Sequence, residues 1–163
     1  MEQRFLEQAR TYLFQYRDRI SACAERLTAE QLWWRPNEHS NSIANLVLHV
    51  CGNLSQWLLQ GLGGRSYERR RSDEFAAREG HSKRELLARL EEVVTAGAGV
   101  LSHLGAEDLR ARRKVQGYDT DGIGIVLHAV EHASYHTGQV VLLAKQLLPE
   151  GEAPEFYPQH RGE

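Results

Sequence analysis

Apolar residues recur at steps of three and four along four stretches of the chain, the spacing that places them on one face of an α-helix. In the first stretch they run from Phe5 to Leu27, with polar residues filling most positions between them. Three later stretches show the same period, and Pro149 follows the last of them. The pattern therefore predicts four helices, over about residues 2–27, 42–60, 82–104 and 121–148.

Capping and breaking residues mark the ends of these helices. Thr28 is placed to cap a short helical turn, and Ser82 with Glu85 three residues later forms a capping box. Pro36 breaks the segment "WWRPNEHSNS", which is predicted as a long loop between the first two helices. Residues 65–79, "RSYERRRSDEFAARE", alternate in charge. We interpret them as a solvated linker between the second and third helices, in preference to a phosphate-binding patch.

Four amphipathic helices in a small chain can hide their apolar faces only by packing together. The predicted fold class is therefore all-α, a four-helix bundle with a long loop between helices 1 and 2 and a charged linker between helices 2 and 3. No run is a convincing strand, apart from a possible short "ARRKV" at residues 111–115. The 163 residues are enough to bury a real core, and we predict a single domain over residues 1–163.

Composition and charge exclude several classes of protein. Hydrophobic residues make up 41% and charged residues 26%, as in ordinary globular proteins, and the net charge of −2 argues against a general nucleic-acid binder. The polar N-terminus lacks the apolar core of a signal peptide, and no apolar run is long enough to span a membrane. Cys23 and Cys51 lie within helical patterns, which indicates buried free thiols in a cytoplasmic protein without membrane partners.

The stretch "HAVEHASYHTGQ", residues 128–139, places a histidine on three successive helical turns. Each four-residue step turns about 40° around the helix, so His136 lies nearest the core face, His132 further out and His128 furthest. His132 and His136 are one turn apart and can converge on one ion. His128 lies about 12 Å from His136 along the helix axis and is predicted to be a neighbour or a surface residue.

A third ligand would have to come from another helix. On the second helix His49 shares a polar stripe with Asn53 and Gln56, which fits a helix that lines a polar cleft and equally fits an ordinary surface boundary. Three neutral imidazoles with an open fourth position are typical of a catalytic metal site. Cys51 lies about 200° around the helix from His49 and is not placed as a nucleophile.

Two longer segments carry a family resemblance. They are "LTAEQLWWRPNEHSNSIANLVLHVCGNL", residues 27–54, and "IVLHAVEHASYHTGQVVLLAK", residues 125–145. The sequence resembles the DinB/YfiT-like superfamily of metal-binding four-helix bundles, in which Asn-Ser-Ile precedes a helix with a histidine and a late helix contains His-x3-His-x2-Gln. Nearly the whole chain matches in order and length. The resemblance implies a metal triad of His49, His132 and His136, with Gln139 completing the second motif.

The resemblance also implies a divalent metal ion as cofactor, with zinc or nickel first and iron or manganese as alternatives, and a homodimer, for which Trp33, Trp34 and Trp57 offer additional apolar surface. The function that the resemblance implies is a metal-dependent enzyme, a thiol S-transferase or hydrolase, that acts on a small-molecule substrate, because some members of the family use a low-molecular-weight thiol such as bacillithiol, mycothiol or glutathione. The alternative is a non-catalytic metal-binding protein in stress response or assembly.

Candidate contacts to the ligating histidines or to substrate are Asn53 and Gln56, on the His49 stripe, and Gln139, near His132 on the helical wheel. Ligation requires neutral imidazoles, so protons are predicted to compete with the metal below about pH 6. An open coordination position that faces a pocket would favour the enzyme over the non-catalytic alternative.

Overall fold

The computed structural model describes residues 1–157, so the last six residues of the predicted domain lie outside the described part. Its elements in chain order are α1 (Glu2–Glu25), α2 (Ala29–Trp33), α3 (Ile43–Leu54), the π-helical turn η1 (Ser55–Gln60), α4 (Arg71–Ala76), α5 (Lys83–Ser102), α6 (Ala106–Arg110), β1 (Arg112–Val115), β2 (Tyr118–Asp121) and α7 (Gly122–Leu147).

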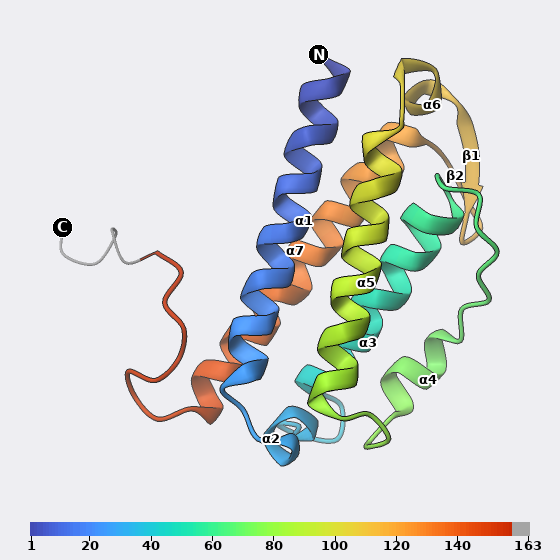
Figure 1. The fold of residues 1–163 in the computed structure, drawn as a ribbon. Helices are drawn as coiled ribbons and strands as arrows, with labels where there is room; N and C mark the ends of the chain where they lie inside the picture. The colour runs from blue at the N-terminus through green and yellow to red at the C-terminus, as the bar shows by residue number, and fades with distance from the viewer. Residues whose placement is uncertain (158–163) are drawn as a thin grey trace.

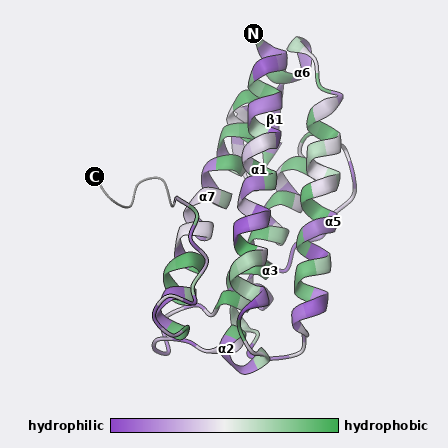
Figure 2. Cartoon of the chain, turned by 60° about the vertical axis from the view of Figure 1, so that its left-hand side comes forward, coloured by the Kyte–Doolittle hydropathy of each residue, from purple (hydrophilic) through white to green (hydrophobic). Residues whose placement is uncertain are grey.

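The long helices form a bundle, as the apolar periodicity predicts. α1 packs against α5 and α7, and α3 packs against the same two helices, so the four contacts close around one core. Leucine and isoleucine side chains from each long helix, among them Leu13, Leu54, Leu90 and Ile125, are almost wholly buried in that core. Figure 2 shows hydrophobic and hydrophilic residues alternating around α1 and α5, as expected for helices with one face in the core.

The helix starts follow the predicted capping residues. Thr28 and Ser82 accept hydrogen bonds from the backbone N–H groups of Gln31 and Glu85, and each box is completed by the reciprocal side chain. A third capping box, formed by Ser42 and Asn45, starts α3. These local signals explain why the predicted and observed helix starts agree closely.

The strictly all-α prediction is wrong at one place. β1 and β2 form an antiparallel hairpin in which Arg112 pairs with Asp121, and the suspected segment "ARRKV" contains β1. Gln116 and Gly117 join the strands, with φ angles of 52° and 85°. Two successive residues with positive φ match the tight hairpin turn whose twist suits paired strands. The hairpin lies at the end of the bundle where α7 begins (Figure 1).

The interpretation of residues 65–79 as a solvated linker holds for most of the segment, whose residues are mainly exposed, but not for Glu74, which is buried. Part of this segment forms α4, which packs on α3 (Figure 1). Arg35 donates to the Phe75 carbonyl at 2.8 Å and to the Asn45 side chain at 2.6 Å, and Asn45 donates to the Glu74 carbonyl at 2.8 Å. These bonds hold the linker backbone against α3, which also packs on α5 and α7, and every residue of α3 is buried.

Cys23 and Cys51 are free and buried, as predicted. Burial raises the pKa of the Cys23 thiol to about 11 and that of Cys51 to about 12. Neither thiol therefore forms the reactive thiolate at neutral pH. Among the described residues, no helix combines the length and apolar character that crossing a membrane requires.

Candidate metal centre

His49, His132 and His136 come together between α3 and α7. Each offers one imidazole nitrogen, and these atoms all lie within 4.8 Å of one another. The Nε2 atoms of His49 and His132 are 3.0 Å apart. Nitrogen ligands around a tetrahedral zinc ion would be separated by about 3.3 Å, so small side-chain adjustments would seat an ion. The donor set and its spacing therefore fit a divalent metal.

The four-residue spacing along α7 accounts for the proximity of His132 and His136. His132 and His136 stand one turn apart on α7, and their ring centroids are 4.5 Å apart. Because α3 packs directly against α7, His49 is carried to within 4.8 Å of both rings, measured between centroids. His49 is only 3% exposed. Of the two interpretations of its polar stripe, the geometry favours the cleft over the surface boundary.

A buried carboxylate fixes the orientation of His49. The His49 Nδ1 group donates to Glu74 Oε2 at 2.8 Å, which leaves the Nε2 lone pair facing the other histidines. Arg69 holds Glu74 in turn, with Nε 2.7 Å from Oε1 and a terminal nitrogen 2.8 Å from Oε2. A carboxylate behind a ligating histidine sets its tautomer and raises its basicity. Sequence analysis missed both Glu74 and Arg69, since it interpreted their segment as solvent-exposed.

The surroundings of Glu74 lower the pKa of its carboxyl group. Burial alone would raise the pKa of Glu74, but hydrogen bonds from His49 and Arg69 and the charge of Arg69 outweigh burial and hold the pKa below its ordinary value. The side chains of Arg69 and Glu74 are 3% and 9% exposed, so the pair is shielded from solvent. Glu74 is therefore an ionised, fixed acceptor for His49 at neutral pH.

Gly52 makes room for this carboxylate on the outer face of α3. A Cβ atom at Gly52 would overlap Glu74 Oε1 and stand 3.0 Å from Arg69 Nε. Gly99 on α5 offers a matched position, because a Cβ there would meet nothing within 4 Å. The absence of a side chain at residue 52 thus allows Glu74 to reach His49.

Gly52→Ala is expected to displace Glu74 and to weaken metal binding about tenfold, the lower end of the effects seen when the partner of a ligating histidine is lost. Isothermal titration with zinc measures the change. Gly99→Ala is the control, and it should leave the affinity unaltered and support α5 slightly through the higher helix propensity of alanine. Equal affinities for both variants would show that Glu74 does not depend on the space at Gly52.

The candidate contacts Asn53, Gln56 and Gln139 lie in different places. The Asn53 amide donates to His128 Nε2 at 3.1 Å, and Gln56 Oε1 accepts from Arg69 at 3.2 Å. Gln139 Oε1 accepts from His136 Nδ1 at 2.7 Å, so Gln139 contacts His136 and not His132, which was its expected neighbour. The i, i+3 spacing brings these two side chains onto one face of α7.

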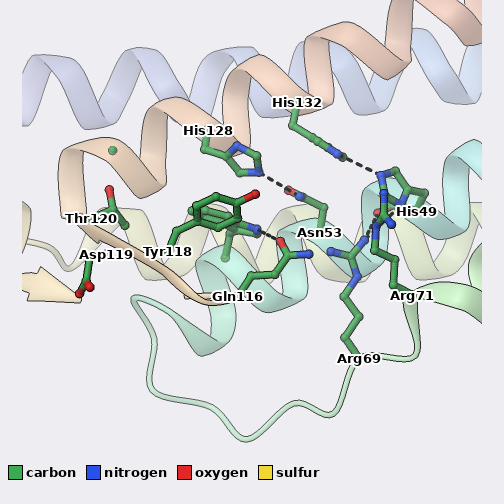
Figure 3. A pocket seen from close by; sticks show the side chains of 12 residues that line it. His49, Asn53, Arg69, Arg71, Gln116, Tyr118, Asp119, Thr120, His128 and His132 are labelled. Carbon is green, nitrogen blue, oxygen red and sulfur yellow. Dashed lines mark hydrogen bonds between the residues drawn. The ribbon is translucent and has the colours of Figure 1, made fainter. Parts of the chain in front are cut away.

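His128 lies outside the three-histidine cluster. Of the two environments predicted for it, a neighbour of the pair or a surface residue, the first is observed, since its ring packs on Trp57 with centroids 3.9 Å apart and it lines a cavity. The partner of His128 is Asn53, one turn beyond His49 on α3 (Figure 3). Trp57 is 4% exposed and is held by its Nε1 hydrogen bond to Gln116 on the hairpin, at 3.1 Å.

The protonation state of His132 and His136 favours the binding of a cation. Burial, together with the neighbouring histidines and Arg69, lowers the pKa of His132 to about 3. Burial lowers the pKa of His136 as well, against a hydrogen bond to Gln139 that raises it. Neutral imidazole is the ligating form, so His132 and His136 need lose no proton to bind a metal at neutral pH. Unperturbed histidine pKa values predict that protons compete with the metal below about pH 6. Because the pKa values of His132 and His136 are lowered in the folded protein, protons should compete at these two ligands only at a lower pH.

These lowered pKa values predict how the metal-free protein responds to acid. The unfolded chain protonates its histidines near pH 6.5, whereas folded His132 stays neutral down to about pH 3. The free energy of unfolding should therefore fall between pH 6.5 and pH 5, by at most about 1.4 kcal/mol per pH unit for each such histidine. Urea unfolding at several pH values measures this slope. His132→Ala should reduce it, and an unchanged slope would contradict the burial of this imidazole.

A cavity of about 720 Å³ opens beside the cluster. His49 and His132 lie at one end, and the hairpin residues Asp119 and Thr120 lie at the other (Figure 3). Trp57 and other side chains of α3, η1 and α7 line the space between them. The size suits a small molecule, and two of the three candidate ligands are accessible from inside it.

Comparisons with known proteins find one family model and several solved structures that are similar to this chain. The family model described as a protein of unknown function (DUF1572) matches residues 1–152. Among solved structures, a DinB-like protein from Bacillus cereus shares 19% identity and a TM-score of 0.72, covering 96% of this chain and all of its own. A DinB-like protein from Bacillus subtilis shares 20% identity and a TM-score of 0.69, covering 92% and 96%.

A conserved protein from Enterococcus faecalis shares 14% identity and a TM-score of 0.71, with 86% of this chain and 95% of that chain covered. These likenesses show that the chain has the DinB-like fold, which is the fold that the sequence resemblance implied. No curated protein matches the chain in sequence.

Proposed function

The chain belongs to the DUF1572 family of proteins of unknown function, and from its DinB-like fold and its histidine cluster we propose that it binds one divalent metal ion. His49, His132 and His136 are the ligands, each through the nitrogen that faces the other two rings. Zinc or nickel is the expected ion, with iron or manganese as alternatives, because an all-imidazole site selects weakly among these metals.

We propose further that the protein is a metal-dependent enzyme, a thiol S-transferase or hydrolase acting on a small molecule. The observation that carries this proposal is the cavity of about 720 Å³ with His49 and His132 at one end. A closed structural site would have a fourth protein ligand, whereas the described residues supply three histidines and an adjoining space. A bound divalent ion would supply a Lewis acid that lowers the pKa of a thiol or water beside it.

The chain's own residues prepare this site. Glu74 keeps the Nδ1 proton on His49, and Gln139 accepts the Nδ1 proton of His136, so both rings present their Nε2 lone pairs. Arg69 holds Glu74 in place from the outer side of α3. The hydrogen bond between Trp57 and Gln116 keeps the hairpin over the far part of the cavity. Such fixed partners reduce the reorganisation that substrate binding would need.

The test begins with metal analysis of the purified protein, followed by a panel of thiols and electrophiles. Glutathione, bacillithiol and mycothiol are each incubated with a small electrophile, using metal-loaded and metal-stripped protein. The proposal predicts thiol transfer or hydrolysis that disappears on stripping and returns on reloading. One bound equivalent of metal without turnover of any pair would favour the non-catalytic alternative, in stress response or assembly.

We also propose a homodimer. The supporting apolar surface is not the one that the tryptophans suggested in the sequence. Trp57 is 4% exposed and packs within the chain, so it gives no support. The outward side of α7 instead exposes Leu127 by 54%, Tyr135 by 61% and Leu142 by 59%. Side chains of this kind favour burial against a partner.

Sedimentation velocity at micromolar concentration is expected to give a dimer. Leu127→Glu should convert it to a monomer, since a buried unpaired carboxylate opposes association. A monomer for the unmodified protein at this concentration would contradict the proposal.

A further inference from the structure

The charges around the cavity do not balance once a metal ion is bound. Glu74 and Arg69 neutralise each other, and the three ligating imidazoles carry no negative charge. The divalent ion and Arg71 then remain as positive charges at the same end of the cavity. Asp119 is the carboxylate that lines the far end, separated from Arg71 in Figure 3.

Arg71 is placed close to the cluster by an aromatic side chain. Its guanidinium lies 5.0 Å from the centre of the Phe75 ring, one turn further along α4. The Phe75 ring in turn packs on the His49 ring, with centroids 4.5 Å apart. Phe75 thus fixes the position of Arg71 relative to a metal ligand, and a guanidinium stacked on a ring keeps its N–H edge free for an acceptor.

Arg71 has no ionic partner within the part of the chain that the structure describes. Arg69, the other arginine that lines the cavity, is paired with Glu74, but the ion pairs formed by residues 1–157 do not include Arg71. The side chain is exposed and lines the cavity. An unpaired cation beside a site for a second cation attracts a ligand with negative charge.

We propose that Arg71 binds a carboxylate of the substrate while another group of the same molecule reaches the metal. One guanidinium matches the single charge and the planar, two-oxygen shape of a carboxylate. Asp119 disfavours an anionic group at the far end, so the molecule enters with its carboxylate towards His49. The inference rests on the proposed function and narrows its substrate class to carboxylate-bearing small molecules, which for a thiol substrate means an acidic thiol.

The experiment uses cobalt(II) as the bound metal, because thiolate binding to cobalt gives a charge-transfer absorption that reports affinity without turnover. Three thiols of similar size are titrated: 3-mercaptopropionate, 2-mercaptoethanol and cysteamine. The unmodified protein should bind the carboxylate-bearing thiol about tenfold more tightly than the neutral one, the effect of one charge-assisted hydrogen-bonded pair. The cationic thiol should bind most weakly.

Arg71→Gln should remove this preference while leaving the cobalt content and the affinity for 2-mercaptoethanol unchanged. Arg70→Gln is the matched control, since Arg70 is the neighbouring exposed arginine and does not line the cavity. For each protein, the affinity for 3-mercaptopropionate is divided by the affinity for 2-mercaptoethanol. Comparing this ratio between the proteins cancels the effect of the different basicities of the thiols.

The outcomes separate the two proposals. Equal binding of the three thiols by the unmodified protein would overturn the Arg71 subsite alone, and so would a preference that survives in Arg71→Gln. Absence of any spectral change with all three thiols would overturn the thiol substrate, and the subsite for acidic thiols with it. Failure of the protein to take up cobalt would overturn the metal site itself.

Discussion

His132→Ala is expected to lower the affinity for zinc by about a hundredfold or more. Four-ligand zinc sites bind with about 10–16 kcal/mol, so one imidazole contributes roughly 3 kcal/mol, and each 1.4 kcal/mol changes an equilibrium constant tenfold. His49→Ala and His136→Ala should have effects of the same size, because all three nitrogens lie within 4.8 Å of one another. Titration against a chelator of known affinity measures each variant.

His128→Ala provides the control on the same helix. His128 lies outside the cluster, and its ring is engaged by Trp57 and Asn53. Its loss should leave the zinc affinity within experimental error, although it changes the wall of the cavity. Zinc loss equal to that of His136→Ala would show that the ligand set includes His128 and that the register assigned to α7 is wrong.

Local sequence signals predicted the four long helices of the fold. The spacing of apolar residues and the capping residues located these helices to within a few residues, since helix starts depend on side chains such as Ser82 and Glu85 that lie three positions apart. The same geometry identified His132 and His136 as a pair, because neighbours one turn apart on a helix must face the same way. These predictions needed no knowledge of tertiary structure.

The carboxylate behind His49 depends on contacts between distant segments. Arg35 and Asn45 bind the backbone around Glu74, and Gly52 leaves space for its side chain. None of these partners is near residues 65–79 in sequence, so charge alternation alone suggested solvent exposure. One signal was present: "IANLVLHVCGNL" is apolar almost all round, and such a helix must be covered on every side. The charged segment, residues 65–79, was the nearest part of the chain not already assigned to a helix, and so it was available to cover this helix.

Glu74→Ala is expected to affect both stability and metal binding. Without the carboxylate, the guanidinium of Arg69 would stay buried without its ionic partner, and breaking one side of a buried ion pair costs about 3–5 kcal/mol. His49 would also lose the acceptor that fixes its tautomer, which lowers metal affinity by about 10- to 100-fold. Urea unfolding of metal-free protein measures the first effect, and chelator competition measures the second.

Glu74→Gln separates orientation from charge. The glutamine carbonyl can still accept from His49, so part of the metal affinity should survive, whereas the lost negative charge leaves Arg69 uncompensated and the free energy of unfolding should fall. Asp73→Asn is the matched control, because Asp73 is the exposed neighbour on α4 and makes no contact with the cluster. It should change neither quantity measurably. If Glu74→Ala bound zinc as tightly as Asp73→Asn, the carboxylate would have no part in positioning His49, and the ion pair with Arg69 would serve only to hold α4 on α3.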